Sequence, residues 1–399
     1  NLEYLKQVPT EYGVVDFYLP DHNMYIEIDG DYWHPTSYEE LNFQTLGNAI
    51  NDNRKSNISN LYRIREGNVA NIETIDDIFK FNHIYDFNIG YRQKIITKEY
   101  LSRKNYKKYI WLLLKFIRQF QPTFPFPATE ETVSYVLKNI PDKIDNILVD
   151  DTFYNNRTSN IGVSYLKSNF KSYWNSKYKG NQTPVDIYNN DTAMKRIIRY
   201  RIGDNKSRET FDFSLHQIIR GISAIRGTIS FFKPALAAAI YKHFLRDIKS
   251  PTVIDPCAGF GGRMLGFKSI YPEGKYIGIE PNPDTFKELQ ILAEGFDNIE
   301  LHNCRLEDYS GSKECDLTFT SIPYYDTEIY STHIEYKTID EWKSTFIKQL
   351  LTFKNLTINV PANLRNCFDK NVVEYRLVNN TSHLNKCKNE KTEYILKIK

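Results

Sequence analysis

The feature that most constrains the fold is a glycine-rich stretch that links an apolar run to a helix-like run. The apolar run covers residues 252–254, the stretch Asp-Pro-Cys-Ala-Gly-Phe-Gly-Gly-Arg covers residues 255–263, and the helix-like run begins at Met264. Glycine lets a backbone turn tightly and approach a ligand that a Cβ atom would exclude. The stretch therefore predicts a strand, a ligand-binding turn and a helix.

From residue 252 onward, strand-like and helix-like runs alternate along the chain. This alternation predicts an α/β fold with a doubly wound parallel sheet that has helices on both faces. Further strands are expected at residues 276–280, 299–302, 316–320 and 356–360, a closing hairpin at 374–379 and 393–398, and helices at 214–222, 234–245, 283–294 and 340–353.

Polar groups follow four of these strands at the point where each one ends. Asp255 ends the first strand, Glu280 the second, Asp308 follows the third, and Ser321 begins a Ser-Ile-Pro-Tyr turn after the fourth. Open parallel sheets bind ligands at the carboxyl ends of their strands, and an acid after the second strand can accept hydrogen bonds from ribose hydroxyls. The pattern predicts a nucleotide-type cofactor beside a pocket for a flat ring that carries an amine.

Residues from about 225 to 399 resemble the S-adenosylmethionine-dependent amino-methyltransferases of nucleic acids. The resemblance implies a Rossmann-like sheet, S-adenosylmethionine as cofactor, and a catalytic tetrad at Ser321, Ile322, Pro323 and Tyr324. It also implies the following cofactor-binding residues: Phe232, Pro234, Asp255, Pro256, Gly259, Gly261, Gly262, Glu280 and Asp308.

The tetrad implies how a base amine is activated. An amine conjugated to a ring is a poor nucleophile, and the Ser321 side chain and the Ile322 carbonyl would hold its hydrogens. Tyr324 would stack on the base after extrusion from the duplex. Ile322 replaces the proline that is usual there, which loosens the turn but leaves the carbonyl. A serine in the first position slightly favours N4 of cytosine, and N6 of adenine stays open.

A second group of acids lies near the N-terminus. Asp16 occurs in a strand-like run at residues 13–19, and Glu27 and Asp29 alternate on a second run at residues 24–29, so both point to one face. A hairpin between the runs would bring Asp16 beside them. Three converging carboxylates favour a cation, and oxygen ligands favour Mg²⁺. His34 is a candidate general base.

This zone resembles the very-short-patch-repair-like branch of the PD-(D/E)XK endonucleases. The matching pieces are Val-Asp-Phe at 15–17, Ile-Glu-Ile-Asp-Gly at 26–30, Tyr-Trp-His at 32–34, a helix expected at 51–61 that carries Asp52 and Lys55, and a strand at 62–66. The resemblance implies a small α/β restriction-endonuclease-like domain with Asp16, Glu27, Asp29 and His34 as catalytic residues and the three acids as metal ligands. The family's leading helix is absent, and we expect an N-terminal piece to be missing before Asn1.

The middle of the chain is basic and rich in aromatic residues. Residues 91–118 contain nine Lys or Arg residues and one acid, and aromatic residues such as Trp111 and Trp174 lie among the cations. Such cations suit a polyanion, whereas aromatic residues at helical spacing are more often core. We expect an endonuclease-like domain at 1–88, a basic helical linker or DNA-binding region at 89–205, and a methyltransferase domain at 206–399.

The sequence predicts a DNA amino-methyltransferase fused to a Mg²⁺-dependent endonuclease, as in single-chain restriction-modification enzymes. Two alternatives stay open: a methyltransferase with a non-cleaving, nuclease-like DNA-binding module, and a non-catalytic DNA-binding protein. RNA is not excluded as the partner. The five cysteines show no paired spacing, and no secretory signal or membrane-spanning run is visible. These features predict a cytoplasmic protein of a bacterium, phage or mobile element, of unknown oligomeric state.

Overall fold

The computed structural model describes residues 3–31, 34, 45–83, 106–178, 182–204, 214–226, 229, 231–323, 328–329, 336, 338–368, 372–379 and 393–398. The chain forms two compact units. The first contains Asn1–Pro125 and Asp186–Ile225, and the second contains Phe126–Val185 and Arg226–Lys399. The basic middle of the chain is thus shared between both units, and the boundaries near residues 88 and 205 stay a prediction.

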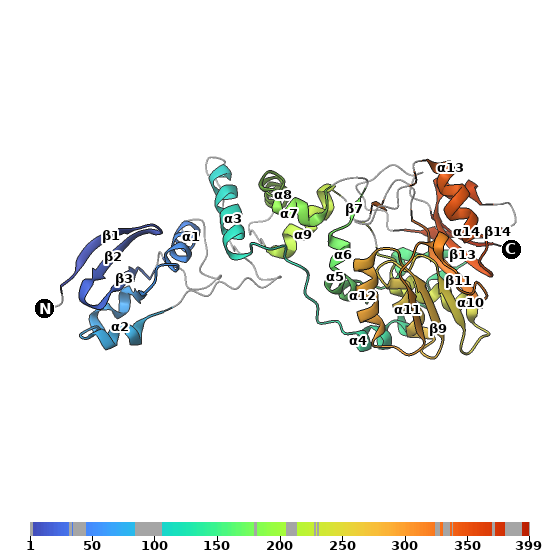
Figure 1. Ribbon diagram of the computed structural model, residues 1–399, viewed down its shortest axis with the longest axis horizontal. Coiled ribbons are helices and arrows are strands. Elements are labelled where there is room, and N and C mark those ends of the chain that lie inside the picture. The colour runs from blue at the N-terminus through green and yellow to red at the C-terminus, as the bar shows by residue number, and fades with distance from the viewer. Residues whose placement is uncertain are drawn as a thin grey trace. The chain divides into compact units, whose positions relative to one another are not determined.

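The first unit begins with a four-stranded sheet (Figure 1). Its strands lie in chain order, and only the last pair is parallel. Leu19, Met24, Ile26 and Ile64 pack against Ile78 to form its core. The strands are β1 Leu5–Thr10, β2 Gly13–Leu19, β3 Met24–Asp29 and β4 Leu61–Arg65, and two helices accompany them, α1 Thr45–Lys55 and α2 Ile75–Phe81.

The helix expected at residues 51–61 was placed wrongly. Helix α1 extends from Thr45 to Lys55, and its buried Leu46, Ala49 and Ile50 continue the apolar stripe upstream of residue 51. A turn follows the helix, and Asn60 takes a left-handed conformation with φ of 59° just before β4. The helix thus ends at Lys55, and Leu61 begins a strand directly after the left-handed Asn60.

The remainder of the first unit is helical. Leu113, Phe116 and Ile117 of α3 are buried, and α3 packs against both α1 and α8. The helices are α3 Tyr106–Phe120, α7 Pro184–Asn189, α8 Asp191–Asp204 and α9 Leu215–Arg226, of which α7 begins and α9 ends within the sequence of the second unit.

The second unit is built on a nine-stranded sheet, which confirms the expected α/β class with a doubly wound, largely parallel sheet. The strand order is β10-β9-β8-β11-β13-β15-β14-β6-β5. The first five strands are mutually parallel, and β15 is antiparallel to both of its neighbours. The strands are β5 Leu148–Val149, β6 Thr152–Tyr154, β8 Thr252–Asp255, β9 Lys275–Ile279, β10 Ile299–His302, β11 Leu317–Ser321, β13 Leu356–Pro361, β14 Val372–Val378 and β15 Glu393–Ile398.

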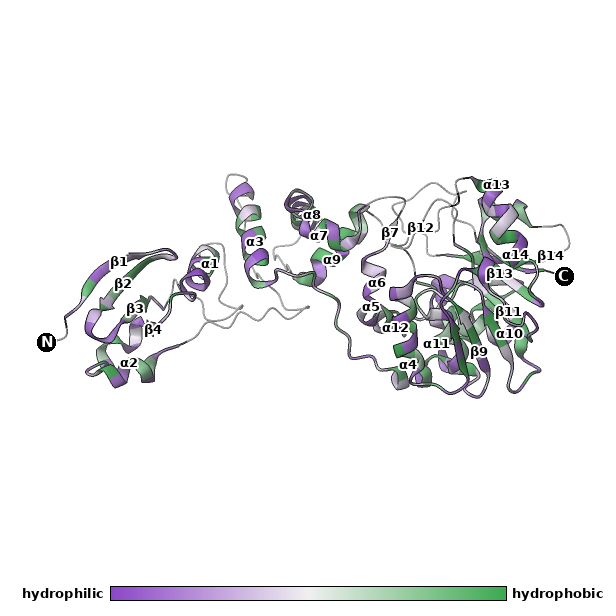
Figure 2. Ribbon diagram, in the orientation of Figure 1, coloured by the Kyte–Doolittle hydropathy of each residue, from purple (hydrophilic) through white to green (hydrophobic). Residues whose placement is uncertain are grey.

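Helices cover this sheet and close its core. Helix α10 is almost wholly buried and strongly apolar (Figure 2), and a second apolar cluster joins Trp342 and Phe346 to Ile358 of β13. The helix predicted at 340–353 is present over residues 339–350, as α13, a π turn and α14 in direct succession. The bounds are α10 Pro234–Leu245, α11 Gly262–Ile270, α12 Pro283–Ala293, α13 Ile339–Trp342, π turn Lys343–Ile347 and α14 Lys348–Leu350.

Part of the basic middle region belongs to this second unit. Phe170, Tyr173 and Trp174 are buried, so the prediction that such aromatic residues form core is confirmed for these three. Ser172 also donates hydrogen bonds to Glu288 of α12. The elements are α4 Val133–Asn139, α5 Val163–Asn169, α6 Lys171–Trp174, and β7 Lys177–Tyr178, which pairs with β12 Glu328–Ile329.

Short helical turns complete both units. In the described part of the chain no helix has the length and apolar character needed to cross a membrane. The 3-10 turns are Pro20–His22, Glu66–Asn71, Pro141–Lys143, Asn155–Arg157, Leu306–Asp308 and Ala362–Cys367.

Candidate functional sites

Asp255 lies at the carboxyl end of β8 and is fully buried. One of its oxygens accepts a hydrogen bond from Thr320 Oγ1 at 2.9 Å, and the other accepts from Arg263 Nε and the Tyr276 hydroxyl, both at 2.7 Å. The Cys257 amide donates to the first oxygen. These donors come from the loop and from two neighbouring strands, so Asp255 ties the glycine loop to the sheet.

The glycines of the loop are needed for close approach. Gly259 and Gly261 have φ of 56° and 77°, which L residues with a Cβ rarely adopt. A Cβ on Gly262 would lie 2.0 Å from the Phe232 carbonyl oxygen, and one on Gly266 would lie 2.4 Å from that of Pro234. The segment that contains Phe232 and Pro234 is therefore packed directly against the start of α11, beside the loop. Pro256 is buried within the loop.

Glu280 follows β9 and is 7% exposed. Its carboxylate accepts hydrogen bonds from the Gly259 and Asn282 amides, each at 2.9 Å. Burial raises the pKa of Glu280 to about 7, although these two bonds oppose the shift. The acid predicted for the ribose thus lies against the glycine loop.

Asp308 and Glu307 end the 3-10 turn after β10 and differ in their surroundings. Asp308 is exposed, whereas the Glu307 carboxylate accepts hydrogen bonds from Arg305 and the Tyr336 hydroxyl. Of the two acids, Asp308 keeps its side chain available to a ligand at this strand end.

Ser321 ends β11, and Ile322 and Pro323 of the predicted catalytic tetrad follow it. Ile322 is 2% exposed and packs in the apolar cluster around Trp342, so its side chain replaces a rigid proline with a hydrophobic anchor. Pro323 is half-buried. Tyr324 lies outside the described residues.

Asn359 of β13 contacts Ser321 and was not predicted from the sequence. The two residues are paired in register, and Asn359 Nδ2 donates to Ser321 Oγ at 3.3 Å and to Glu393 Oε2 at 3.0 Å. Asn359 is 3% exposed, and its Oδ1 has no hydrogen-bond partner among the described residues. The sequence does show Asn359 as a single amide side chain within the otherwise largely apolar run of residues 356–360. Its contacts with Ser321 and Glu393 could not be predicted, because they depend on the order of the strands in the sheet.

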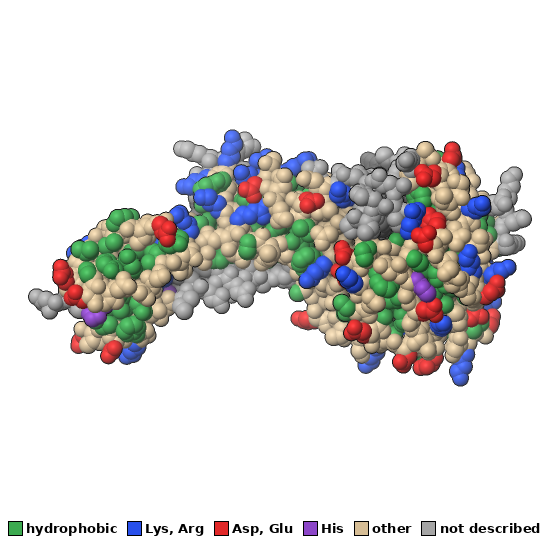
Figure 3. Space-filling view, in the orientation of Figure 1, with side chains coloured by type: hydrophobic (Ala, Val, Ile, Leu, Met, Phe, Trp, Pro, Cys, Tyr) green, Lys and Arg blue, Asp and Glu red, His purple; other side chains and the backbone are tan. Residues whose placement is uncertain are grey.

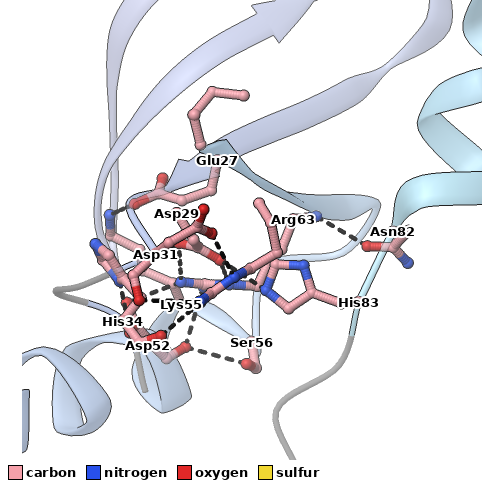
Figure 4. A network of polar contacts seen from close by, with 12 residues as sticks. Glu27, Asp29, Asp31, His34, Asp52, Lys55, Ser56, Arg63, Asn82 and His83 are labelled. Atoms are coloured by element: carbon pink, nitrogen blue, oxygen red, sulfur yellow. Dashed lines mark hydrogen bonds and ion pairs between the residues drawn. The ribbon is translucent and has the colours of Figure 1, made fainter. Parts of the chain in front are cut away.

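The first unit holds a different polar cluster, shown in Figure 4. Asp29, His34 and Asp52 place one potential ligand atom each within 4.8 Å of one another. His34 Nδ1 lies 2.8 Å from Asp52 Oδ2 and 3.4 Å from Asp29 Oδ1. The hydrogen bond to Asp52 raises the pKa of His34 above its ordinary value.

Arg63 of β4 lies inside this cluster, and the sequence had given no role to it. Its guanidinium donates to both Asp29 oxygens at 2.9 Å and lies 2.8 Å from Asp52 Oδ1. Arg63 is 3% exposed, so its charge is held between the two carboxylates without competition from water. His83 contacts Asp29 from the other side at 3.1 Å.

The predicted convergence of Asp16, Glu27 and Asp29 on a metal stays a prediction: of the three, only Asp29 joins the group with His34 and Asp52 found among the described residues. Asp16 accepts a hydrogen bond from the Ile28 amide at 2.9 Å and another from Gln7. Glu27 is paired with Lys55 of α1. Lys55 contacts only Oε1 of Glu27, and the buried Oε2 has no hydrogen-bond partner among the described residues.

The group of Asp29, His34 and Asp52 does not fit Mg²⁺, which had been predicted on Asp16, Glu27 and Asp29. Magnesium prefers an octahedral set of oxygens and keeps several waters. The assembled donor group contains an imidazole, and a buried guanidinium already neutralises both of its carboxylates. A divalent cation beside Arg63 would meet a like charge at short range in a desolvated site, which is unfavourable.

Comparisons with known proteins identify methyltransferases as structural neighbours. No family model matches the sequence, and no curated protein matches it. A putative methyltransferase from Escherichia coli aligns at 13% identity and a TM-score of 0.29, over 41% of this chain and 86% of that one. A putative RNA methyltransferase from Pyrococcus horikoshii aligns at 14% and 0.30, over 42% and 83%. TrmN from Thermus thermophilus aligns at 14% and 0.30, over 42% of this chain but only 49% of its own length. Likenesses this low say nothing of substrate or reaction.

Proposed function

We propose that the second unit transfers a methyl group from S-adenosylmethionine to an exocyclic amine of a nucleic-acid base, N4 of cytosine or N6 of adenine. The observation that carries the proposal is the common position of Glu280, Asp308 and Ser321 after β9, after β10 and at the end of β11, the strands on either side of β8, which leads into the glycine loop. Ligands of open parallel sheets bind at this edge.

The residues at this edge fit such a cofactor. Gly259 presents backbone without a Cβ, and an added Cβ would meet no atom nearer than 3.7 Å, so there is open space above the loop. The Glu280 carboxylate could accept the ribose hydroxyls, and Asp308 could accept the adenine amine. Bound there, S-adenosylmethionine would supply an electrophilic methyl group. Asp255 would act through the loop that it anchors, since its own oxygens accept four hydrogen bonds within the protein.

Ser321 and Ile322 would act on the target base. The Ser321 hydroxyl oxygen and the Ile322 carbonyl oxygen would accept the two amine hydrogens, which turns the nitrogen lone pair towards the methyl group. Tyr324 is proposed to stack on the base. Holding the amine in line is an orientational contribution, which is a major source of rate in group transfer.

Methyl transfer can be tested with labelled S-adenosylmethionine and a mixed DNA substrate, followed by mass spectrometry of the nucleosides. We expect N4-methylcytosine or N6-methyladenine, and loss of an acceptor in Ser321→Ala should lower the rate by about 100-fold. Ser344→Ala, on an exposed turn, is the matched control. Equal methyl incorporation by the Ser321 and Ser344 variants would show that Ser321 is not part of the catalytic site. Parallel assays with RNA show which of the two polymers is methylated.

For the first unit we propose a nuclease-like module that binds nucleic acid without Mg²⁺-dependent cleavage. The supporting observation is Arg63, which neutralises Asp29 and Asp52. Supercoiled plasmid incubated with Mg²⁺ should stay intact with the wild-type protein, as with Asp29→Asn. Nicking by the wild type that is lost in Asp29→Asn would show an active endonuclease instead, as first expected from the sequence.

A further inference from the structure

A pocket of about 380 Å³ lies within the first unit, between α1, α3 and α8. Four cations line it, together with one exposed aromatic ring and one acid: Arg54, Trp111, Lys115, Arg118, Asp191 and Lys195. Figure 3 shows Lys and Arg side chains gathered over α3 and α8. We refer to it as the basic pocket.

The charges of the basic pocket are unbalanced. Arg118 is satisfied, since it donates to Asp191 at 2.9 Å and to the Tyr188 carbonyl. Arg54, Lys115 and Lys195 have no carboxylate partner in the part of the chain that the structure describes. Cations that converge on a concave surface raise the local potential, because the protein wall focuses their field.

Trp111 is the second independent feature of the pocket. Its side chain is 45% exposed, whereas Ile110, Leu112 and Leu113 on either side are buried. The Lys115 ammonium, one helical turn further, lies 3.9 Å from the centre of the indole ring. Exposure of a large aromatic ring beside cations is typical of surfaces where a base stacks and a phosphate pairs.

We infer that the basic pocket binds a single-stranded stretch of nucleic acid, with its phosphates on Arg54, Lys115 and Lys195 and one unpaired base stacked on Trp111. The volume lies within the range of pockets that enclose small ligands, which suits a nucleotide unit. The single strand is favoured over a duplex because only an unpaired base can offer its face to the indole.

This inference rests on the proposed function only in that nucleic acid is the substrate. It adds a second contact surface, in a unit that does not contain the methyl-transfer residues. Helix α1 carries Arg54 in the pocket and Asp52 in the cluster of Figure 4, so a strand in the pocket would lie close to that cluster.

The test measures binding by fluorescence anisotropy, without S-adenosylmethionine, to a labelled single strand and to its duplex. Trp111→Ala should weaken single-strand binding about fivefold or more and leave duplex binding unchanged, and Trp111→Phe should restore most of it. Lys115→Gln and Lys195→Gln should each lower the salt slope of single-strand binding by about 0.7. Thermal midpoints of the variants should equal that of the wild type.

Matched controls come from α2 of the same unit. Phe79→Ala removes an exposed aromatic residue, and Lys80→Gln removes an exposed lysine that also lies over a ring. The inference would be overturned if the pocket variants bound the single strand as tightly as these controls do. Equal losses of affinity for the single strand and the duplex would also overturn it, as would full displacement of the strand by polyglutamate. Ser321→Ala should bind the single strand as the wild type does. A failure of methyl transfer would therefore not affect the binding result for the basic pocket.

Discussion

Glu280 shows how a buried acid near the loop can link cofactor binding to pH. Burial raises its pKa from an ordinary value of 4.5 to about 7. In the protein without ligand, the folded state favours the protonated acid. The contribution of this shift to the free energy of unfolding is therefore fully present below pH 4.5 and is lost as the pH rises through about 7. The ribose hydroxyls would instead favour the carboxylate, since they donate to it.

We therefore predict that affinity for S-adenosylhomocysteine increases as the pH rises through about 7 and then levels off. Calorimetric titration over that range gives the measurement, with proton uptake or release obtained from buffers of different ionisation enthalpy. Glu280→Gln should bind weakly and without this pH dependence. A wild-type affinity that is flat across the range would assign the ribose contact elsewhere.

Asn359 is a positioning residue in the proposed mechanism. It donates to Ser321 and to Glu393, and burial raises the pKa of Glu393 although its hydrogen bond from Asn359 opposes the shift. We predict that Asn359→Ala lowers the rate of methyl transfer about tenfold or more, because Ser321 loses its fixed orientation.

S-adenosylhomocysteine affinity and the thermal midpoint separate this role from a structural one. Both should change little in Asn359→Ala, and Asn359→Gln should not restore the rate because the longer side chain displaces the amide. A rate that falls only in proportion to lost folded protein would contradict the assignment.

At this scale the sequence predicted which residues lie near strand ends, but not which residues strand register brings into contact. Glu280, Asp308 and Ser321 could be placed because the end of an apolar run, and the polar residues after it, can be read from the sequence alone. Arg63 could not, because its role depends on the parallel pairing that sets it opposite Glu27 and within reach of Asp29. Asn359 was missed for the same reason.

Among elements, the junction of the glycine loop with α11 depends on a backbone contact. A Cβ at Gly262 would lie 2.0 Å from the Phe232 carbonyl oxygen, which is backbone and cannot rotate away. Gly262→Ala should therefore cost about 1–3 kcal/mol of stability and weaken cofactor binding, as the Phe232 segment moves. Urea unfolding and calorimetric titration give the two quantities.

Gly295→Ala provides the control for this substitution. Its added Cβ would meet only the Leu292 carbonyl oxygen at 3.8 Å, which is an ordinary contact. Equal losses of stability in the two variants would show that the Phe232 segment moves away from the added Cβ at Gly262 without destabilising the protein.

The core of the parallel sheet was predictable because its strands are apolar runs with turn signals between helical spacers. Its far edge was not. Strands β5 and β6 contain two and three residues, too few for any periodicity, yet β6 pairs with β14. The sheet therefore takes residues from the basic middle region, which was predicted to be a helical linker or DNA-binding region without strands.

At the scale of the whole molecule, composition and contacts divide the chain differently. Charge separates residues 89–205 from their flanks, whereas packing assigns residues 126–185 to the second unit and residues 186–225 to the first. The chain thus leaves the first unit, builds part of the second and returns. Charge patterning reports on partners rather than on which residues share a core, so the sequence could not show this path.

Two compact cores predict two unfolding transitions in calorimetry, since each unit buries its own apolar cluster. S-adenosylhomocysteine should raise only the transition of the second unit, because a ligand stabilises the unit that binds it. Arg63→Met should lower only the other transition, since it leaves the buried Asp29 and Asp52 without their shared cation. A single transition that both changes shift would mean that the two units unfold together, and the shared middle region would then couple ligand binding in the second unit to the stability of the first.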